Sequence, residues 1–112
     1  MELSKKDKKT ARELIEKGLQ SEYSIGLSQV DKIIQQWKNT ELNNRDAYKQ
    51  LYSHVKKYDK HIALRYNDLS GSRYLMTVAV LLYDGIISES DLEGFSEETK
   101  QILKIWKQLH KE

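Results

Sequence analysis

Not one proline occurs in the 112 residues, and glycine occurs only five times. Because proline breaks helices and glycine weakens them, their scarcity predicts a mostly helical chain. Apolar residues also recur at helical spacing, about 3.6 residues per turn, along most of the sequence. The sequence therefore predicts a single all-α domain over residues 1–112, a bundle of four main helices and one short helix.

Polar and turn-forming residues divide this pattern into segments. The first helix is expected to begin after Ser4, a suitable N-cap. Its apolar stripe changes phase near Gly26, where we expect a bend or break rather than one straight helix. A second main helix is expected from Asn44, its cap, to about Asn67. Residues 68–72 form the next break, because they are rich in turn formers.

The most apolar segment, residues 73–84, is expected to form a helix at the centre of the bundle, because a helix that is apolar on all sides is normally buried. A strand is the competing interpretation, since short apolar runs are ambiguous. Gly85 fits the position just after a helix. Ser88, with Asp91 three residues later, predicts a capped short helix, and Ser96 predicts the start of the last helix.

Several classes of site are improbable on composition and motifs. The chain has no cysteine, which excludes disulfides, thiolate zinc sites and cysteine nucleophiles. No phosphate-binding glycine loop, calcium loop or nucleophile elbow is present. The start of the chain lacks the apolar run of a secretory signal, and no apolar stretch approaches the roughly twenty residues that span a bilayer. We expect no metal, no cofactor, no membrane contact and a cytoplasmic location.

Histidine and aspartate on the second main helix are the residues with most chemical potential. His54 and His61 lie seven residues apart, which is about 10.5 Å of helical rise and too far for one ion. We interpret both as surface-edge histidines. Asp59 falls inside the apolar arc, so we expect it to be buried and paired with a tyrosine hydroxyl or an arginine. Only Glu22 resembles a second inward carboxylate, and less clearly.

The chain contains seven tyrosines, four of them on the second main helix. These four are Tyr48, Tyr52, Tyr58 and Tyr66. We interpret them as core residues with their hydroxyls at the rim, and the alternative is a face that binds a partner protein. The candidate partner-binding residues are Tyr52, His54, Tyr58, Asp59, His61 and Arg65.

Charge is unevenly distributed, although the net charge is only +2. Residues 44–66 carry six basic and two acidic side chains, whereas residues 84–98 carry six acidic side chains and no basic one. Such opposed blocks can be neighbours within the fold, or they can steer association, including head-to-tail contact between copies. A basic helix face also fits phosphate contact. The candidate nucleic-acid-binding residues are Arg45, Lys49, Lys56, Lys57 and Lys60.

These features predict a small non-enzymatic helical protein that acts through protein–protein interaction, by self-association or by binding a partner protein. Nucleic-acid binding by the basic face of residues 44–66 is the alternative. A helix-turn-helix is disfavoured, because its second helix at residues 88–93 would carry three acidic side chains towards phosphates. An enzyme ranks third, since it would need Asp59, His54 or His61 to line a pocket.

Overall fold

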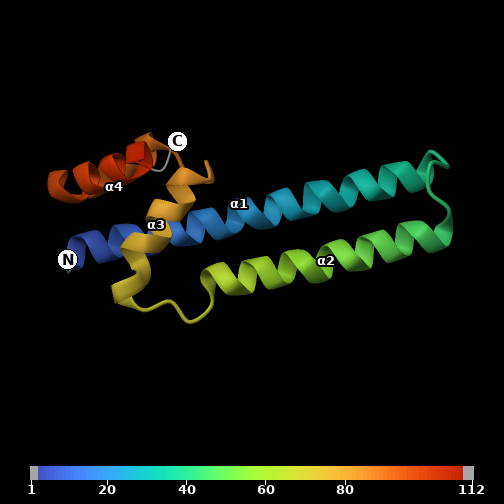
Figure 1. The fold of residues 1–112 in the computed structure, drawn as a ribbon, viewed down its shortest axis with the longest axis horizontal. Helices are drawn as coiled ribbons and strands as arrows, with labels where there is room; N and C mark the ends of the chain where they lie inside the picture. Colours follow the sequence, from blue (N-terminus) through green and yellow to red (C-terminus); the bar gives the residue numbers. More distant parts are fainter. Residues whose placement is uncertain (1–2, 110–112) are drawn as a thin grey trace. The chain divides into compact units, whose positions relative to one another are not determined.

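The computed structural model describes residues 3–109, and 83% of these are helical with no strand among them (Figure 1). The predicted all-α fold, with four main helices and a short fifth, is confirmed. The main helices are α1 (Lys5–Lys38), α2 (Asn44–Tyr66), α3 (Tyr74–Tyr83) and α4 (Glu97–Leu109). The short helix is the 3-10 helix η2 (Glu89–Gly94), and a further 3-10 turn, η1 (Gly71–Arg73), precedes α3.

The chain groups into two compact units, and α1 contributes to both. Unit one comprises Met1–Gln20 and Asp68–Glu112, and unit two comprises Ser21–Asn67. That the whole chain acts as a single domain stays a prediction.

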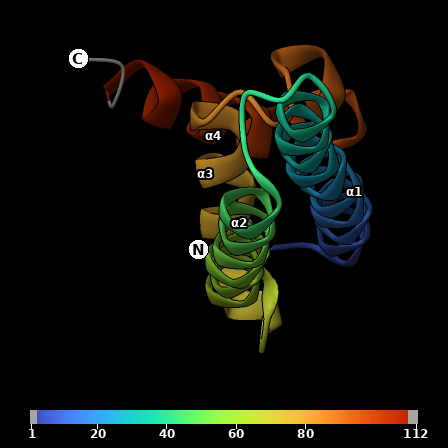
Figure 2. The same ribbon diagram turned by 90° about the vertical axis from the view of Figure 1, so that its right-hand side faces the viewer.

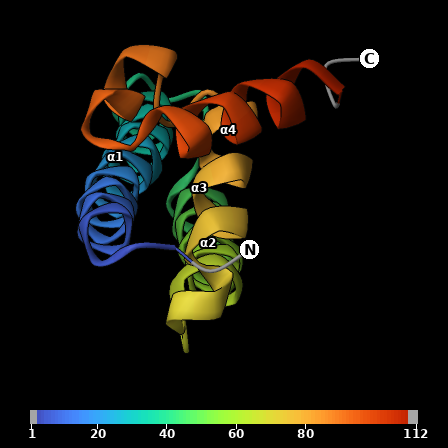
Figure 3. The ribbon, with the colours of Figure 1, turned by 90° about the vertical axis from the view of Figure 1, so that its left-hand side faces the viewer.

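Unit one holds most of the buried apolar side chains of the described residues. Leu81 and Leu82 on α3 are at most 1% exposed, and α3 packs on α4, which crosses it in Figure 3. The helix predicted over residues 73–84 is therefore confirmed, and the competing strand is wrong. Gly85 follows α3 with a φ of 75°, which glycine adopts without the strain a side chain would bring.

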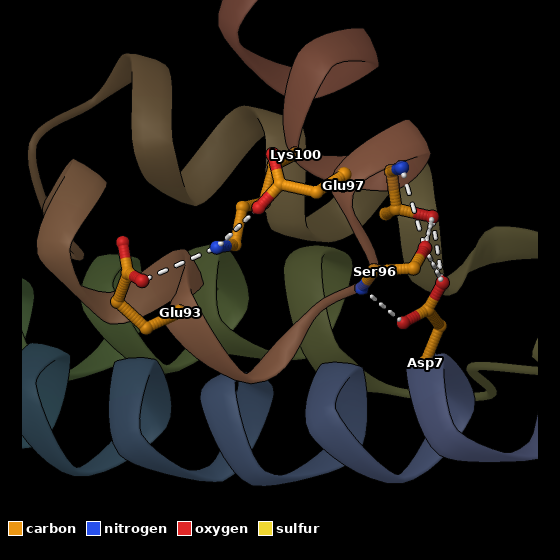
Figure 4. Close-up of polar contacts among 6 residues, drawn as sticks. Asp7, Glu93, Ser96, Glu97 and Lys100 are labelled. Carbon is orange, nitrogen blue, oxygen red and sulfur yellow. Dashed lines mark hydrogen bonds and ion pairs between the residues drawn. The ribbon is translucent and has the colours of Figure 1, made fainter.

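A buried carboxylate near the start of α1 holds the N-terminus of α4 (Figure 4). Asp7 is 2% exposed and accepts hydrogen bonds from the backbone N–H of Ser96 at 2.9 Å and from the Ser96 hydroxyl at 2.7 Å. The Thr99 hydroxyl donates a third at 2.7 Å. Burial opposes ionisation of Asp7, but these hydrogen bonds outweigh it and lower its pKa. A negative charge at this position also complements the helix dipole.

The start of α2 differs by one residue from the prediction. Asn43, not Asn44, is the N-cap, and its side chain accepts from the backbone N–H of Asp46 at 2.8 Å. The side chain of Asn44 instead accepts from Trp37 Nε1 at 2.7 Å. Asn44 therefore connects the start of α2 to the end of α1.

Helix α1 continues without interruption through Gly26, so the predicted break there is wrong. This glycine is buried because α2 approaches it closely: a Cβ built on Gly26 would lie 2.9 Å from two ring carbons of Tyr58. The change in phase of the apolar stripe has another cause. Residues up to Gln20 belong to unit one, whereas residues from Ser21 pack against α2. One helix therefore presents different faces to different neighbours.

Candidate binding surface

Unit two is an antiparallel helical hairpin made by residues 21–38 of α1 and the whole of α2. Figure 2 views the two helices nearly end-on and shows them side by side. In this unit, Ala47 and Ile62 are the apolar side chains that the structure shows as buried. Polar contacts are therefore important for fixing how the two helices face each other.

A buried glutamate is the centre of these contacts. Glu22 on α1 is 2% exposed and accepts hydrogen bonds from His61 Nε2 at 2.7 Å and from Arg65 Nη1 at 2.9 Å. The hydroxyl of Tyr66 donates to the other carboxylate oxygen. The hydroxyl of Tyr58 donates to the backbone carbonyl of Glu22 at 2.7 Å. We call these five residues the Glu22 cluster.

The electrostatics of the Glu22 cluster keep the glutamate ionised. Burial opposes its ionisation, but the hydrogen bonds from Tyr66 and His61 and the charge of Arg65 outweigh burial and lower the pKa of Glu22. Burial raises the pKa of Tyr66, and the hydrogen bond to Glu22 raises it further. Burial and the same carboxylate raise the pKa of Tyr58. At neutral pH the glutamate is therefore charged and both tyrosines are neutral donors.

Because of the contacts in this cluster, the side of α2 that faces α1 is not the centre of its apolar stripe. At about 100° per residue, His54, His61 and Arg65 lie to one side of the apolar arc, and these polar side chains face α1. As a consequence Tyr48 is 75% exposed and Tyr52 is 62% exposed. The core interpretation of the tyrosines is wrong for these two, while Tyr58 and Tyr66 are partly buried as expected.

The expected burial of Asp59 is also wrong, because the side chain is exposed. It lies on the outward side of α2 with Tyr52 and Val55. The partners predicted for it were a tyrosine hydroxyl or an arginine, and Glu22 has one of each. A helical wheel of α2 alone could not show this, because the position of α1 decides which side of the wheel is covered.

Because part of the apolar stripe of α2 points away from α1, an apolar surface is exposed along one side of the hairpin. We call this surface the hairpin face. Its members are Tyr23, Leu27, Val30, Ile34 and Trp37 from α1, with Tyr48, Leu51, Tyr52 and Val55 from α2. Leu27 is 70% exposed. A groove of about 140 Å³ lies between Leu27 and Val55, and one of about 300 Å³ lies between Trp37 and Tyr48. Extended apolar surfaces of this kind mark interaction sites.

Exposed lysines follow α2, namely Lys49, Lys56, Lys57 and Lys60. Lys49 and Lys56 neighbour Tyr52 at the edge of the hairpin face, and Lys60 continues this row. Lys57 does not border this face, and with Lys49 it lines a separate groove that also contains Ile33 and His54. Within residues 3–109 the structure gives none of the four an ion pair. The two arginines of α2 differ, because Arg65 pairs with Glu22 and Arg45 lies 3.9 Å from its neighbour Asp46. The basic character predicted for this helix is therefore carried mainly by its lysines.

The acidic segment at residues 84–98 is largely paired inside unit one. Its partners are lysines of α1 and α4, and Figure 4 shows Lys100 between two glutamates. The pairs are Lys17–Asp91, Lys100–Glu93 at 3.2 Å, Lys100–Glu97 at 3.1 Å and Lys107–Glu89 at 3.8 Å. Asp91 also accepts from the backbone N–H of Ser88 at 2.8 Å, which confirms the predicted cap. Four of the six carboxylates of this segment therefore have a lysine partner within their own unit, with three lysines serving the four.

The six candidate partner-binding residues divide into two groups. His61, Arg65 and Tyr58 join the Glu22 cluster, and His54 Nε2 donates to the backbone carbonyl of Gly26 at 3.2 Å. The other two, Tyr52 and Asp59, are exposed beside the grooves.

The residues of α1 on the hairpin face were not among the predicted site residues. Their spacing was visible as an apolar stripe over residues 27–37, which the sequence pattern assigns equally well to a core.

Unit one carries an apolar groove of its own, between α3 and α4. It has a volume of about 360 Å³ and is lined mainly by Met76, Val80, Tyr83 and Trp106. The adjoining lysine, Lys107, pairs with Glu89. This groove therefore lacks the unpaired charges that accompany the hairpin face.

Other kinds of site are not seen in the described residues. Across residues 3–109, no group of three histidine, aspartate or glutamate side chains is placed to hold a metal ion. No helix in that part of the chain combines the length and the apolar character needed to cross a membrane. Comparisons with protein-family models, with curated proteins and with solved structures each find no match.

Proposed function

We propose that this chain is a non-enzymatic protein-binding module, and that the hairpin face binds an α-helix of another protein molecule in the cytoplasm. The observation that carries the proposal is the exposure of large apolar side chains in a row along two adjacent helices. Leu27, Tyr48 and Tyr52 are each more than 60% exposed. Tyrosine and tryptophan are also the residues that most often anchor protein interfaces.

Energetics support a helical partner. Fully burying one large apolar side chain contributes about 1.5–3 kcal/mol, so covering several of them on this face favours association. The side chains of α1 and of α2 on the hairpin face form two rows with a groove between them, and a third helix can bind in this groove, as in helix-in-groove recognition.

The polar residues support binding rather than catalysis. Nε2 of His54 and Nε2 of His61 contact acceptors on α1, and both carboxylate oxygens of Glu22 accept hydrogen bonds. Their role in this arrangement is to hold the hairpin together.

The test compares two double variants of the full chain. Leu27→Gln with Tyr52→Gln alters the hairpin face, and Leu64→Gln with Leu109→Gln removes equally exposed leucines elsewhere. Light scattering reports self-association, and pull-down from the native host reports partners. We expect the first variant to lose the association and the second to keep it. A wild-type chain that stays monomeric and retains no protein contradicts the proposal.

Nucleic-acid binding is the second candidate, and the unpaired lysines of α2 favour it. Phosphate contacts predict an affinity that falls steeply as salt rises. A gel-shift series at low and moderate salt, with Lys56→Glu and Lys60→Glu as the variant, tests this candidate. The absence of a shift at low salt would end it.

A further inference from the structure

We infer that the helix bound by the hairpin face is acidic and belongs to a different protein, with an apolar stripe bordered on one side by aspartate or glutamate. This inference rests on the proposed function and specifies the chemistry of the partner. It follows from the unpaired lysines beside the face and from the pairing of the chain's own acidic segment.

The position of the lysines is the first step. Lys49 and Lys56 lie three residues before and four residues after Tyr52, so they neighbour it on the surface of α2. Lys60 follows Lys56 by four residues and continues the row. Their methylene stems can cover apolar surface while the ammonium groups reach beyond it. A helix lying on the hairpin face would therefore have lysines along its α2-facing edge.

The opposite border of the face has no net charge. On α1, Ser24, Asp31 and Lys38 occupy the corresponding positions, three residues before or four residues after Leu27 and Ile34. A bound helix is therefore expected to be acidic on the edge that faces α2 and to carry no net charge on the edge that faces α1. Asp59 is the acidic residue of α2 beside the lysines, and three lysines outweigh its charge.

A second copy of this chain fits less well than a different protein. Four of the six carboxylates of its acidic segment already pair with Lys17, Lys100 and Lys107 within unit one. Its hairpin face would bring only Asp31 and Asp59 towards the lysine row. Charge complementarity therefore favours an acidic partner over self-association.

The length of the face sets the length of the partner. From Tyr23 to Trp37 the α1 side spans about 21 Å at 1.5 Å of rise per residue. A partner helix of about four turns covers that distance, with apolar anchors at positions i, i+3 or i+4, and i+7.

The experiment selects helical peptides on the full-length chain. In a display library of 18-residue peptides, all members share one stripe of leucine and isoleucine. Each remaining position is glutamate, lysine, glutamine or serine. Enriched peptides are synthesised, and their affinity is measured by fluorescence anisotropy at low and high salt. We expect the enriched peptides to carry a net negative charge, and their affinity to fall by roughly tenfold or more at high salt. Enrichment of neutral or basic peptides overturns the inference.

Two triple variants provide the matched comparison. Lys49→Glu, Lys56→Glu and Lys60→Glu reverse the lysine row, while the same reversal at Lys9, Lys32 and Lys104 changes net charge equally at exposed positions elsewhere. Circular dichroism checks that both remain folded. The first variant is expected to lose at least roughly tenfold in peptide affinity, and the second to lose little. Equal loss in both variants overturns the inference.

The remaining outcomes separate this inference from the proposed function. If no peptide is enriched but the chain dimerises through the hairpin face, the acidic partner is wrong and protein binding stands. If no peptide is enriched and no association occurs, both are wrong. If nucleic acid binds through the lysine row and this binding is unchanged by Leu27→Gln with Tyr52→Gln, both the inference and the proposed function are wrong. The nucleic-acid candidate is then supported.

Discussion

Glu22 is surrounded by donors from α2. Arg65 supplies a permanent charge, His61 a ring N–H, and Tyr66 a hydroxyl. Moving a carboxylate out of water is costly, so its contribution depends on all of these contacts being made together. The same requirement gives the pair of helices one register, because another alignment would leave a buried charge without donors.

Replacing Glu22 by glutamine should destabilise the chain by about 1.5–3 kcal/mol at neutral pH, the value of hydrogen bonds to a charged group. The pKa of Glu22 is lowered on folding, below its ordinary value of 4.5. Its contribution is therefore complete above that value and is lost as the pH falls through the folded pKa. Urea unfolding followed by circular dichroism measures the effect.

The pH comparison supplies the control, because Asp7 is present in both chains. We expect the difference in unfolding free energy between wild type and Glu22→Gln to shrink from about pH 5 to about pH 3. A difference that stays constant over this range would show that the glutamate acts through its shape and not its charge.

Helix α1 joins two neighbourhoods through two buried carboxylates, Asp7 and Glu22. Their separation of fifteen positions corresponds to about 22 Å of rise, and each carboxylate contacts a different helix. Gly26 lies one turn beyond Glu22, where the ring of Tyr58 occupies the space that a side chain would fill. Glycine there serves close packing and does not end the helix.

Gly26→Ala should therefore destabilise the hairpin, although alanine is the better helix former by up to about 1 kcal/mol. The new methyl group would displace the Tyr58 ring and disturb its hydrogen bond to Glu22, with a net cost of about 1–2 kcal/mol. In a Tyr58→Leu background the same change should be neutral or stabilising. Chemical unfolding of the four chains gives this double-mutant cycle. An equal stabilisation in both backgrounds would contradict close packing as the reason for the glycine.

Burial is distributed unequally over the chain. Of the apolar side chains shown as buried, eleven belong to unit one and two belong to unit two. Local stability follows the amount of buried apolar surface. Unit two is therefore the part of the chain whose stability increases most when a partner covers its exposed surface.

Hydrogen–deuterium exchange should show this difference directly. We expect backbone amides in the middle of α2 to exchange roughly tenfold or more faster than those in the middle of α3 when no partner is present. Added binding peptide should slow exchange in α2 and leave α3 unchanged. Uniform protection of both helices in the free chain would contradict the unequal stability.

Local properties of the chain were predictable from its residues. Helical periodicity, the absence of proline and the caps at Ser88 and Ser96 are features of neighbouring positions, and they correctly predicted the helices and most of their ends. The position of Gly85 just after a helix was predicted for the same reason. Such features need no knowledge of distant residues.

Contacts between distant residues were decided only by the packing of the helices. An apolar arc shows which side of a helix can be buried, but the partner helix determines which side is buried. Here polar donors on α2 meet Glu22, so Asp59 and two tyrosines point outwards although their arc is apolar. The capping of α4 by Asp7, across 89 positions of sequence, likewise has no local signal. A one-dimensional period carries no information about the angle at which two helices meet.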